Sequence, residues 1–153
     1  MIYLLIIFVL ALAVAPLLHF APSKHQRRIA RLREFAALQG LFVEFRSIPE
    51  ATLSSAELSG HAPGKTIYYG LRIPATGRSR RESGAWLNGE QGWRSIPRGG
   101  AVPAQFEKLP PGIFAASVDQ GSWGIYWQEA GDEVEIAVIS NVLSSLLDPA
   151  HCS

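Results

Sequence analysis

Cysteine is almost missing from this chain, because Cys152 is the only one among 153 residues. A single cysteine cannot form a disulfide within the chain, which excludes the disulfide-stabilised class of small extracellular domains. We interpret Cys152 as a free thiol next to the C-terminus, with palmitoylation or an intermolecular bridge as the alternatives.

The sequence also lacks the common signatures of catalysis and ligand binding. It contains no G-x-S-x-G elbow, no phosphate loop of the form G-x-x-x-x-G-K-[ST], and no C-x-x-C or H-E-x-x-H pair. The histidines are too scattered for a metal site: they are His19, His25, His61 and His151. We therefore predict a protein that is not an enzyme and that needs no cofactor or metal.

Charge is absent from the first 21 residues, MIYLLIIFVLALAVAPLLHFA. An apolar helix of about 20 residues crosses a hydrocarbon core of about 30 Å, so the sequence predicts a transmembrane anchor over residues 1–21. A cleavable secretory signal is the alternative, but Pro16 directly follows the best cleavage motif, Ala13-Val14-Ala15, and argues against processing there. Ala11 and Ala15 have the small-xxx-small spacing that permits pairing with another membrane helix.

A basic segment follows the charge-free run at once, and no lysine or arginine precedes it. Basic residues beside a span stay on the cytoplasmic side. We therefore predict a single-pass protein of a bacterial inner membrane, with the N-terminus outside and the remaining chain in the cytoplasm. The basic residues are candidates for contact with anionic lipid or with a partner: Lys24, Arg27, Arg28, Arg31 and Arg33.

Residues 22–40 predict a basic, amphipathic juxtamembrane helix. Ile29, Leu32 and Phe35 recur near the helical period, and Gly40 is suited to end the helix. The helix lies either on the membrane surface or against the domain that follows. Its short apolar stripe favours the second arrangement.

Residues 41–153 predict a single β-rich α+β domain with a mainly antiparallel sheet and a short C-terminal helix. Stretches rich in β-branched and aromatic residues predict strands at 41–45, 66–73, 113–118 and 123–128. Asn88-Gly89 predicts a hairpin that joins Trp86-Leu87 to Trp93–Ile96. The intervening stretches 47–65 and 95–111 are expected to be loops.

The last part of the domain shows two patterns in succession. Val134, Ile136 and Val138 alternate with Glu133, Glu135 and Ala137, which predicts a strand over 133–139 with one wet face. Ser140 or Asn141 is then expected to cap the final helix, which ends at Asp148-Pro149.

Basic residues are absent after Lys108, whereas six acidic residues follow it. This asymmetry either orients the domain against anionic lipid or lets the two ends of the domain pair. A second basic group lies in the loop Gly77-Arg78-Ser79-Arg80-Arg81, where Arg78, Arg80 and Arg81 are candidates for lipid or partner contact. A solvated hairpin tip is the plainer interpretation.

Aromatic residues are concentrated in the middle of the domain. They are expected to fill the core of a small sheet, with one or two left exposed as part of a binding surface: Trp86, Trp93, Trp123, Trp127, Tyr68, Tyr69 and Tyr126. No RNP-like run accompanies them, so nucleic acid is not expected as a partner.

Two segments carry a family resemblance. Pro22-Ser23-Lys24-His25-Gln26-Arg27-Arg28 after the apolar run, and Asp132-Glu133-Val134-Glu135-Ile136 before an apolar helical end, resemble the YajC family of small translocase accessory proteins. The resemblance covers little of the chain, which is longer and has an aromatic middle and Arg-rich loops that those proteins lack. It implies an inner-membrane location and an accessory role at a secretion channel, and it assigns no role to any residue.

These patterns support two hypotheses of function. The first is a noncatalytic accessory or scaffold protein that presents a cytoplasmic domain to an integral membrane protein complex. The second is a membrane-tethered module that binds anionic lipid or a small ligand. Membrane lipids and a membrane protein complex are the expected partners.

Overall fold

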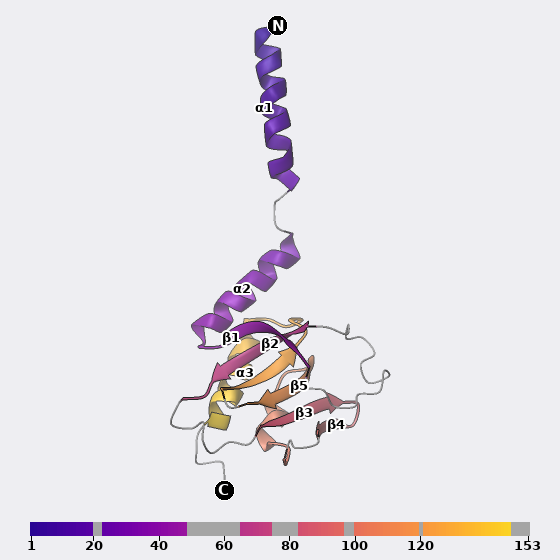
Figure 1. Ribbon diagram of the computed structural model, residues 1–153, viewed down its shortest axis with the longest axis vertical. Helices are drawn as coiled ribbons and strands as arrows, with labels where there is room; N and C mark the ends of the chain where they lie inside the picture. Colours follow the sequence, from indigo (N-terminus) through magenta and orange to yellow (C-terminus); the bar gives the residue numbers. More distant parts are fainter. Residues whose placement is uncertain (20–22, 49–64, 75–82, 97–99, 120, 148–153) are drawn as a thin grey trace. The chain divides into compact units, whose positions relative to one another are not determined.

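The computed structural model describes residues 1–19, 23–48, 65–74, 83–96, 100–119 and 121–147. The chain divides into two compact units, Met1–Arg31 and Leu32–Ser153. The first unit holds helix α1 (Ile2–His19) and the beginning of helix α2 (Lys24–Leu38). The second unit holds the end of α2, the sheet and the C-terminal helix (Figure 1).

Helix α1 corrects the prediction made for the charge-free run. It has 18 residues. Among the described residues, no helix combines the length and apolar character needed to cross a membrane. The predicted transmembrane anchor over residues 1–21 is therefore wrong, as are the predicted single-pass inner-membrane location and the orientation with the N-terminus outside.

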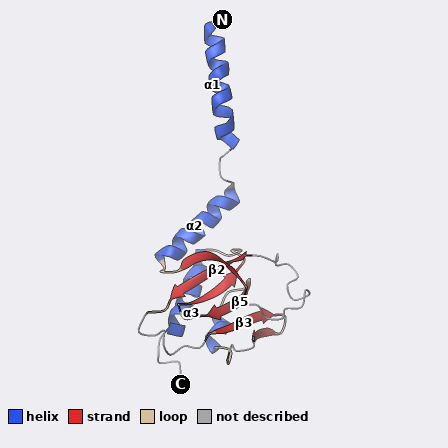
Figure 2. Ribbon diagram, viewed as in Figure 1, coloured by secondary structure: helices blue, strands red, loops and turns tan. Residues whose placement is uncertain are grey.

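The second unit is built on one antiparallel sheet with the order β1-β2-β6-β5-β3-β4 (Figure 2). This confirms the α+β class, the antiparallel sheet and a hairpin that joins β3 to β4. Asn88 and Gly89 are paired within the hairpin strands, however, and its turn lies at Glu90-Gln91. The strand bounds are β1 Phe42–Ser47, β2 Lys65–Arg72, β3 Gly84–Gly89, β4 Gly92–Ser95, β5 Ile113–Val118 and β6 Ser122–Trp127.

The C-terminal helix α3 (Glu133–Leu147) begins seven residues before Ser140, and the strand predicted over 133–139 does not exist. Asp132 caps the helix, because its Oδ1 accepts the N–H groups of Val134 and Glu135 at 2.9 and 3.2 Å. Ile136, Ile139 and Leu143 are fully buried, which is the spacing of one helical face.

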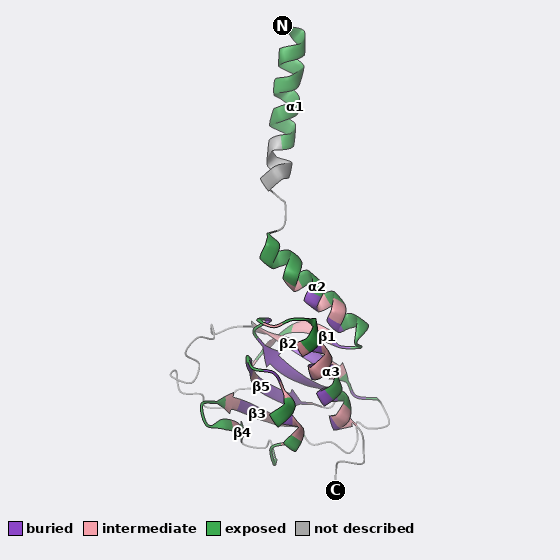
Figure 3. Ribbon diagram, turned by 180° about the vertical axis from the view of Figure 1, so that it is seen from behind, coloured by how far each residue is buried: buried purple, intermediate pink, exposed green. Residues whose placement is uncertain are grey.

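The sheet packs a hydrophobic cluster on each face. The larger cluster joins Tyr69, Ile125 and Trp127 of the sheet to the buried residues of α3, and the smaller cluster on the other face includes Tyr68 and Tyr126. Buried residues follow the central strands and the inner side of α3 (Figure 3). Most of the aromatic residues are core, as predicted. Three of the four tryptophans are buried, whereas Trp93 is half-buried.

A short 3₁₀ helix, Ala104–Lys108, interrupts the stretch predicted as a loop at 95–111. Its Phe106 is buried and packs edge-on against Trp86, with ring centroids 5.4 Å apart. Trp86 also stacks on Trp123 at 5.3 Å. The segment therefore completes the larger cluster at the β3 side of the sheet.

Candidate functional site

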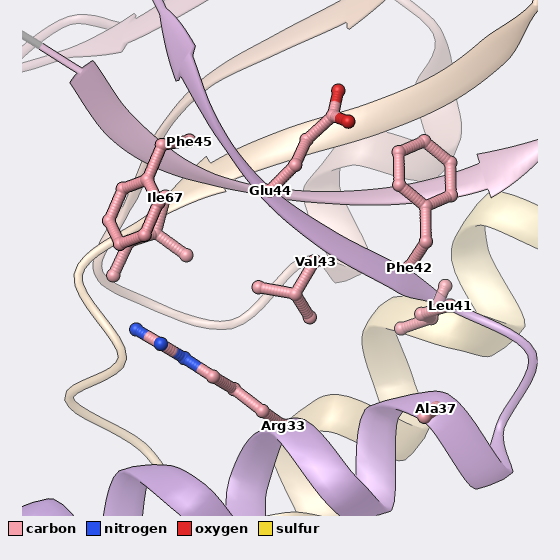
Figure 4. A pocket seen from close by; sticks show the side chains of 8 residues that line it. All are labelled: Arg33, Ala37, Leu41, Phe42, Val43, Glu44, Phe45 and Ile67. Atoms are coloured by element: carbon pink, nitrogen blue, oxygen red, sulfur yellow. The ribbon is translucent and has the colours of Figure 1, made fainter.

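A groove of about 370 Å³ lies between the end of α2 and strand β1. Figure 4 shows α2 along one side and β1 crossing above it, with side chains from both elements directed into the space between. The lining is mostly apolar and consists of Arg33, Ala37, Leu41, Phe42, Val43, Glu44, Phe45 and Ile67.

Strand β1 is an edge strand, because it pairs with β2 alone. Its outer edge has no strand neighbour among the described residues, and such an edge presents backbone N–H and C=O groups to any approaching chain. Phe45 on this strand is 59% exposed. An exposed aromatic side chain beside a free strand edge is the kind of surface that binds protein partners.

Arg33 forms one end of the groove and is held by a buried carboxylate. Its Nε and Nη2 donate to Oε1 and Oε2 of Glu129 at 2.7 and 2.8 Å, and the hydroxyl of Tyr69 donates to Oε1 at 2.7 Å. The side chain of Glu129 is 1% exposed, whereas that of Arg33 is 35% exposed. The hydrogen bonds from Arg33 to Glu129 raise the pKa of the guanidinium, and burial followed by the bond to Glu129 raises the pKa of Tyr69.

Glu129 also has an unusual backbone conformation, with φ at +54°. A residue other than glycine rarely adopts this left-handed region, which costs free energy. The bidentate ion pair and the tyrosine hydroxyl offset that cost. The arrangement fixes the plane of the Arg33 guanidinium, which also lies 5.7 Å from the centre of the Phe45 ring.

A second polar cluster lies at the turn between β5 and β6. Asp119 Oδ1 accepts the N–H groups of Gly121 and Ser122, both at 2.7 Å, and Oδ2 accepts from Arg46 Nη1 at 2.9 Å. Burial by itself would raise the pKa of Asp119, but the backbone donors and Arg46 outweigh it, and the pKa lies below its ordinary value. Arg46 also pairs with Glu44, so this cluster ties β1 to the turn and satisfies its own charges.

Replacement of Asp119 by asparagine is expected to lower the free energy of unfolding at pH 7 by about 1 kcal/mol, a value discounted for its exposure. A carboxyl whose pKa is lower in the folded state stabilises the fold above its unfolded pKa, and this contribution is lost as pH falls through the folded pKa. Urea denaturation of both proteins should therefore give a difference that shrinks between pH 7 and pH 3. A difference that stays constant would assign the effect to shape instead of charge.

The predicted contact residues belong to different parts of the chain. Lys24, Arg27, Arg28 and Arg31 are exposed on α2 within the first unit, whereas Arg33 belongs to the second unit and pairs with Glu129. Ala11 is exposed on α1. The remaining candidates lie outside the described side chains: Ala15 and the loop residues Arg78, Arg80 and Arg81.

The sequence interpretation missed the groove and the role of Glu129. Its only local signal is Glu129-Ala130-Gly131-Asp132, which marks a turn but gives no sign of a partner 96 residues away. Within the described part of the chain, no three His, Cys, Asp or Glu residues gather as a metal site would require.

The architecture defines an α+β module with one antiparallel sheet, two helices packed against it, and an apolar groove beside its first edge strand. Comparison with protein-family models, with curated proteins and with solved structures finds no match to this chain. The comparisons therefore add no support to the resemblance to the YajC family.

Proposed function

We propose that the second unit is a noncatalytic protein-binding module that takes up an extended segment of a partner alongside β1. The observation that carries this proposal is the apolar groove beside an unpaired strand edge. Peptides that add a strand to a sheet gain affinity from main-chain hydrogen bonds and specificity from pockets for alternate side chains. The free edge of β1 offers main-chain hydrogen bonds, and the groove offers a pocket for side chains of the bound segment.

The lining explains why an apolar side chain is the expected occupant. Val43 and Ile67 are half-buried and form part of the larger cluster, while Ala37 on α2 is small and exposed. An entering side chain thus meets apolar surface that is already ordered, which reduces the entropy cost of binding. This retains the accessory or scaffold role expected from the sequence, without its membrane location.

Selection from a library of displayed random octapeptides on the full-length protein tests this proposal. We expect enriched peptides with apolar residues at alternate positions, because alternate side chains of a strand face the same side. Replacement of Ala37 by tryptophan fills the groove and should weaken the selected peptides at least about tenfold in fluorescence polarisation, which corresponds to about 1.4 kcal/mol.

The matched control is Ala30→Trp, the same change at another exposed alanine of α2 that does not line the groove. It should leave peptide affinity unchanged, and thermal unfolding should show that both variants remain folded. Peptides that bind Ala37→Trp as tightly as the unaltered protein would sink the proposal, and so would a selection that enriches none.

A further inference from the structure

The groove contains one feature that a purely apolar ligand would leave unused. A guanidinium has five N–H donors. Glu129 accepts hydrogen bonds from two of the donors of Arg33, one on Nε and one on Nη2. Nη1 therefore takes no part in that pairing. Figure 4 shows the guanidinium directed toward Phe45 and Ile67, at the end of the groove away from Leu41.

Arg33 is also the only basic residue of the lining. The one acidic residue there, Glu44, pairs with Arg46, and it lies on the opposite face of β1 from Val43 and Phe45, because successive side chains of a strand alternate. A ligand on the groove side therefore meets Arg33 as its nearest charge. Carboxylates form short, charge-assisted hydrogen bonds with arginine, which are stronger than bonds between neutral groups.

The spacing of the lining residues sets the spacing in the ligand. Arg33 and Ala37 are one helical turn apart, about 6 Å along α2. Two residues of an extended strand cover about 6.8 Å, so side chains two positions apart in a bound strand match this separation. One of them lies at Arg33, and the other lies against Ala37 and Val43.

The direction of the bound segment follows from the sheet, in which every pair of neighbouring strands is antiparallel. Strand β1 runs from the Ala37 end of the groove toward Phe45 and Arg33. An antiparallel segment enters at Arg33 and leaves at Leu41. Its residue at Arg33 therefore comes first in sequence.

We infer that the partner segment carries an aspartate or glutamate two positions before an apolar residue, with the carboxylate bound by Arg33 Nη1 and the apolar side chain in the groove. This inference rests on the proposed function and specifies its ligand. Glu129 acts as a positioning residue, because it fixes the guanidinium without touching the ligand.

Three capped, fluorescein-labelled peptides test the inference on the unaltered full-length protein. The first is Ser-Thr-Asp-Thr-Leu-Thr-Ser, the second has Asn in place of Asp, and the third has the same composition in reversed order, Ser-Thr-Leu-Thr-Asp-Thr-Ser. We expect the first peptide to bind about tenfold more tightly than either of the others. Its advantage over the Asn peptide should shrink when salt is raised from 0.15 to 1 M, because salt screens the charge pair.

The outcomes separate the inference from the proposed function. Equal affinity of the Asp and Asn peptides, with both lost in Ala37→Trp, would overturn the inference and leave the groove as a peptide site. Tighter binding of the reversed peptide would overturn the assigned order. If none of the three binds, the inference also falls, and the octapeptide selection decides independently whether the groove binds any extended segment.

Discussion

Replacement of Arg33 by methionine is expected to lower the free energy of unfolding by about 3 to 5 kcal/mol. Methionine keeps most of the apolar stem but removes both donors to Glu129. The carboxylate, with 1% of its side chain exposed, then loses the guanidinium that pairs with it. Breaking a buried pair from one side costs more than the pair contributes, because the remaining charge stays desolvated.

The reciprocal change, Glu129→Gln, is expected to cost less. Arg33 is 35% exposed and can turn toward water, while glutamine retains an oxygen that accepts from the Tyr69 hydroxyl. The double variant Arg33→Met/Glu129→Gln removes both charges and should be more stable than Arg33→Met alone, because no buried charge remains. Urea unfolding of the three variants and the unaltered protein completes the cycle.

A matched control for the cycle is Arg31→Met, which removes an exposed arginine from the same helix. Surface changes of this kind stay within about 0.5 kcal/mol. The ion pair would lose its structural role if Arg33→Met cost no more than Arg31→Met. Additive effects in the double variant would likewise show that the two charges do not interact.

This pair also shows where sequence reasoning stops. Arg33 belongs to a run of basic residues on one amphipathic helix, and periodicity alone gave it the same role as Arg31, a solvated or lipid-facing cation. The two differ because Arg33 lies one residue after Leu32, where the helix becomes part of the folded domain. A contact between residues 33 and 129 leaves no trace in local pattern, so the candidate site could not be predicted.

The misassigned strand at 133–139 has a different cause, because the correct signal was present. Asp132 and Glu135 have the spacing of a helix N-terminus, with a capping residue followed three positions later by glutamate. Val134, Ile136 and Val138 alternate by chance, and Val134 proves 70% exposed. Seven residues are too few to distinguish the strand period of two from the helical period. The capping pattern at Asp132 and Glu135 is therefore the better indicator, and it favours a helix.

The charge-free N-terminal run illustrates a third limit. Its composition correctly predicted a helix, but composition alone does not fix where a helix ends, and no helix among the described residues combines the length and apolar character needed for a span. The strands, by contrast, were predicted well. Their β-branched and aromatic stretches encode local structure directly, although the turn of the β3–β4 hairpin lies at Glu90-Gln91, just after the Asn-Gly pair.

Replacement of Gly124 by alanine is expected to destabilise the domain by about 3 kcal/mol. Gly124 on β6 lies opposite Gly70 on β2, and the ring of Tyr68 occupies the space above both. A Cβ at position 124 would lie 2.2 Å from Cζ of Tyr68 and 2.4 Å from its hydroxyl oxygen. Atoms cannot approach this closely, so the tyrosine would have to leave its place.

Displacement of Tyr68 is costly because the ring is fully buried and held on several sides. Its hydroxyl bonds Ser122 Oγ at 3.0 Å, its edge packs on Tyr126 with centroids 5.2 Å apart, and the Arg46 guanidinium lies 4.1 Å from the ring centre. Loss of these contacts adds to the strain from overpacking.

The control for this clash is Gly89→Ala at the β3 hairpin, where an added Cβ meets nothing within 4 Å. It should change the free energy of unfolding by no more than about 0.5 kcal/mol. In a Tyr68→Val background, where the ring is gone, Gly124→Ala should cost less than about 1 kcal/mol, because the coupling between the two sites has been removed. A cost that stays near 3 kcal/mol in that background would mean that position 124 requires glycine for its backbone conformation, and not because the Tyr68 ring occupies the space of a Cβ.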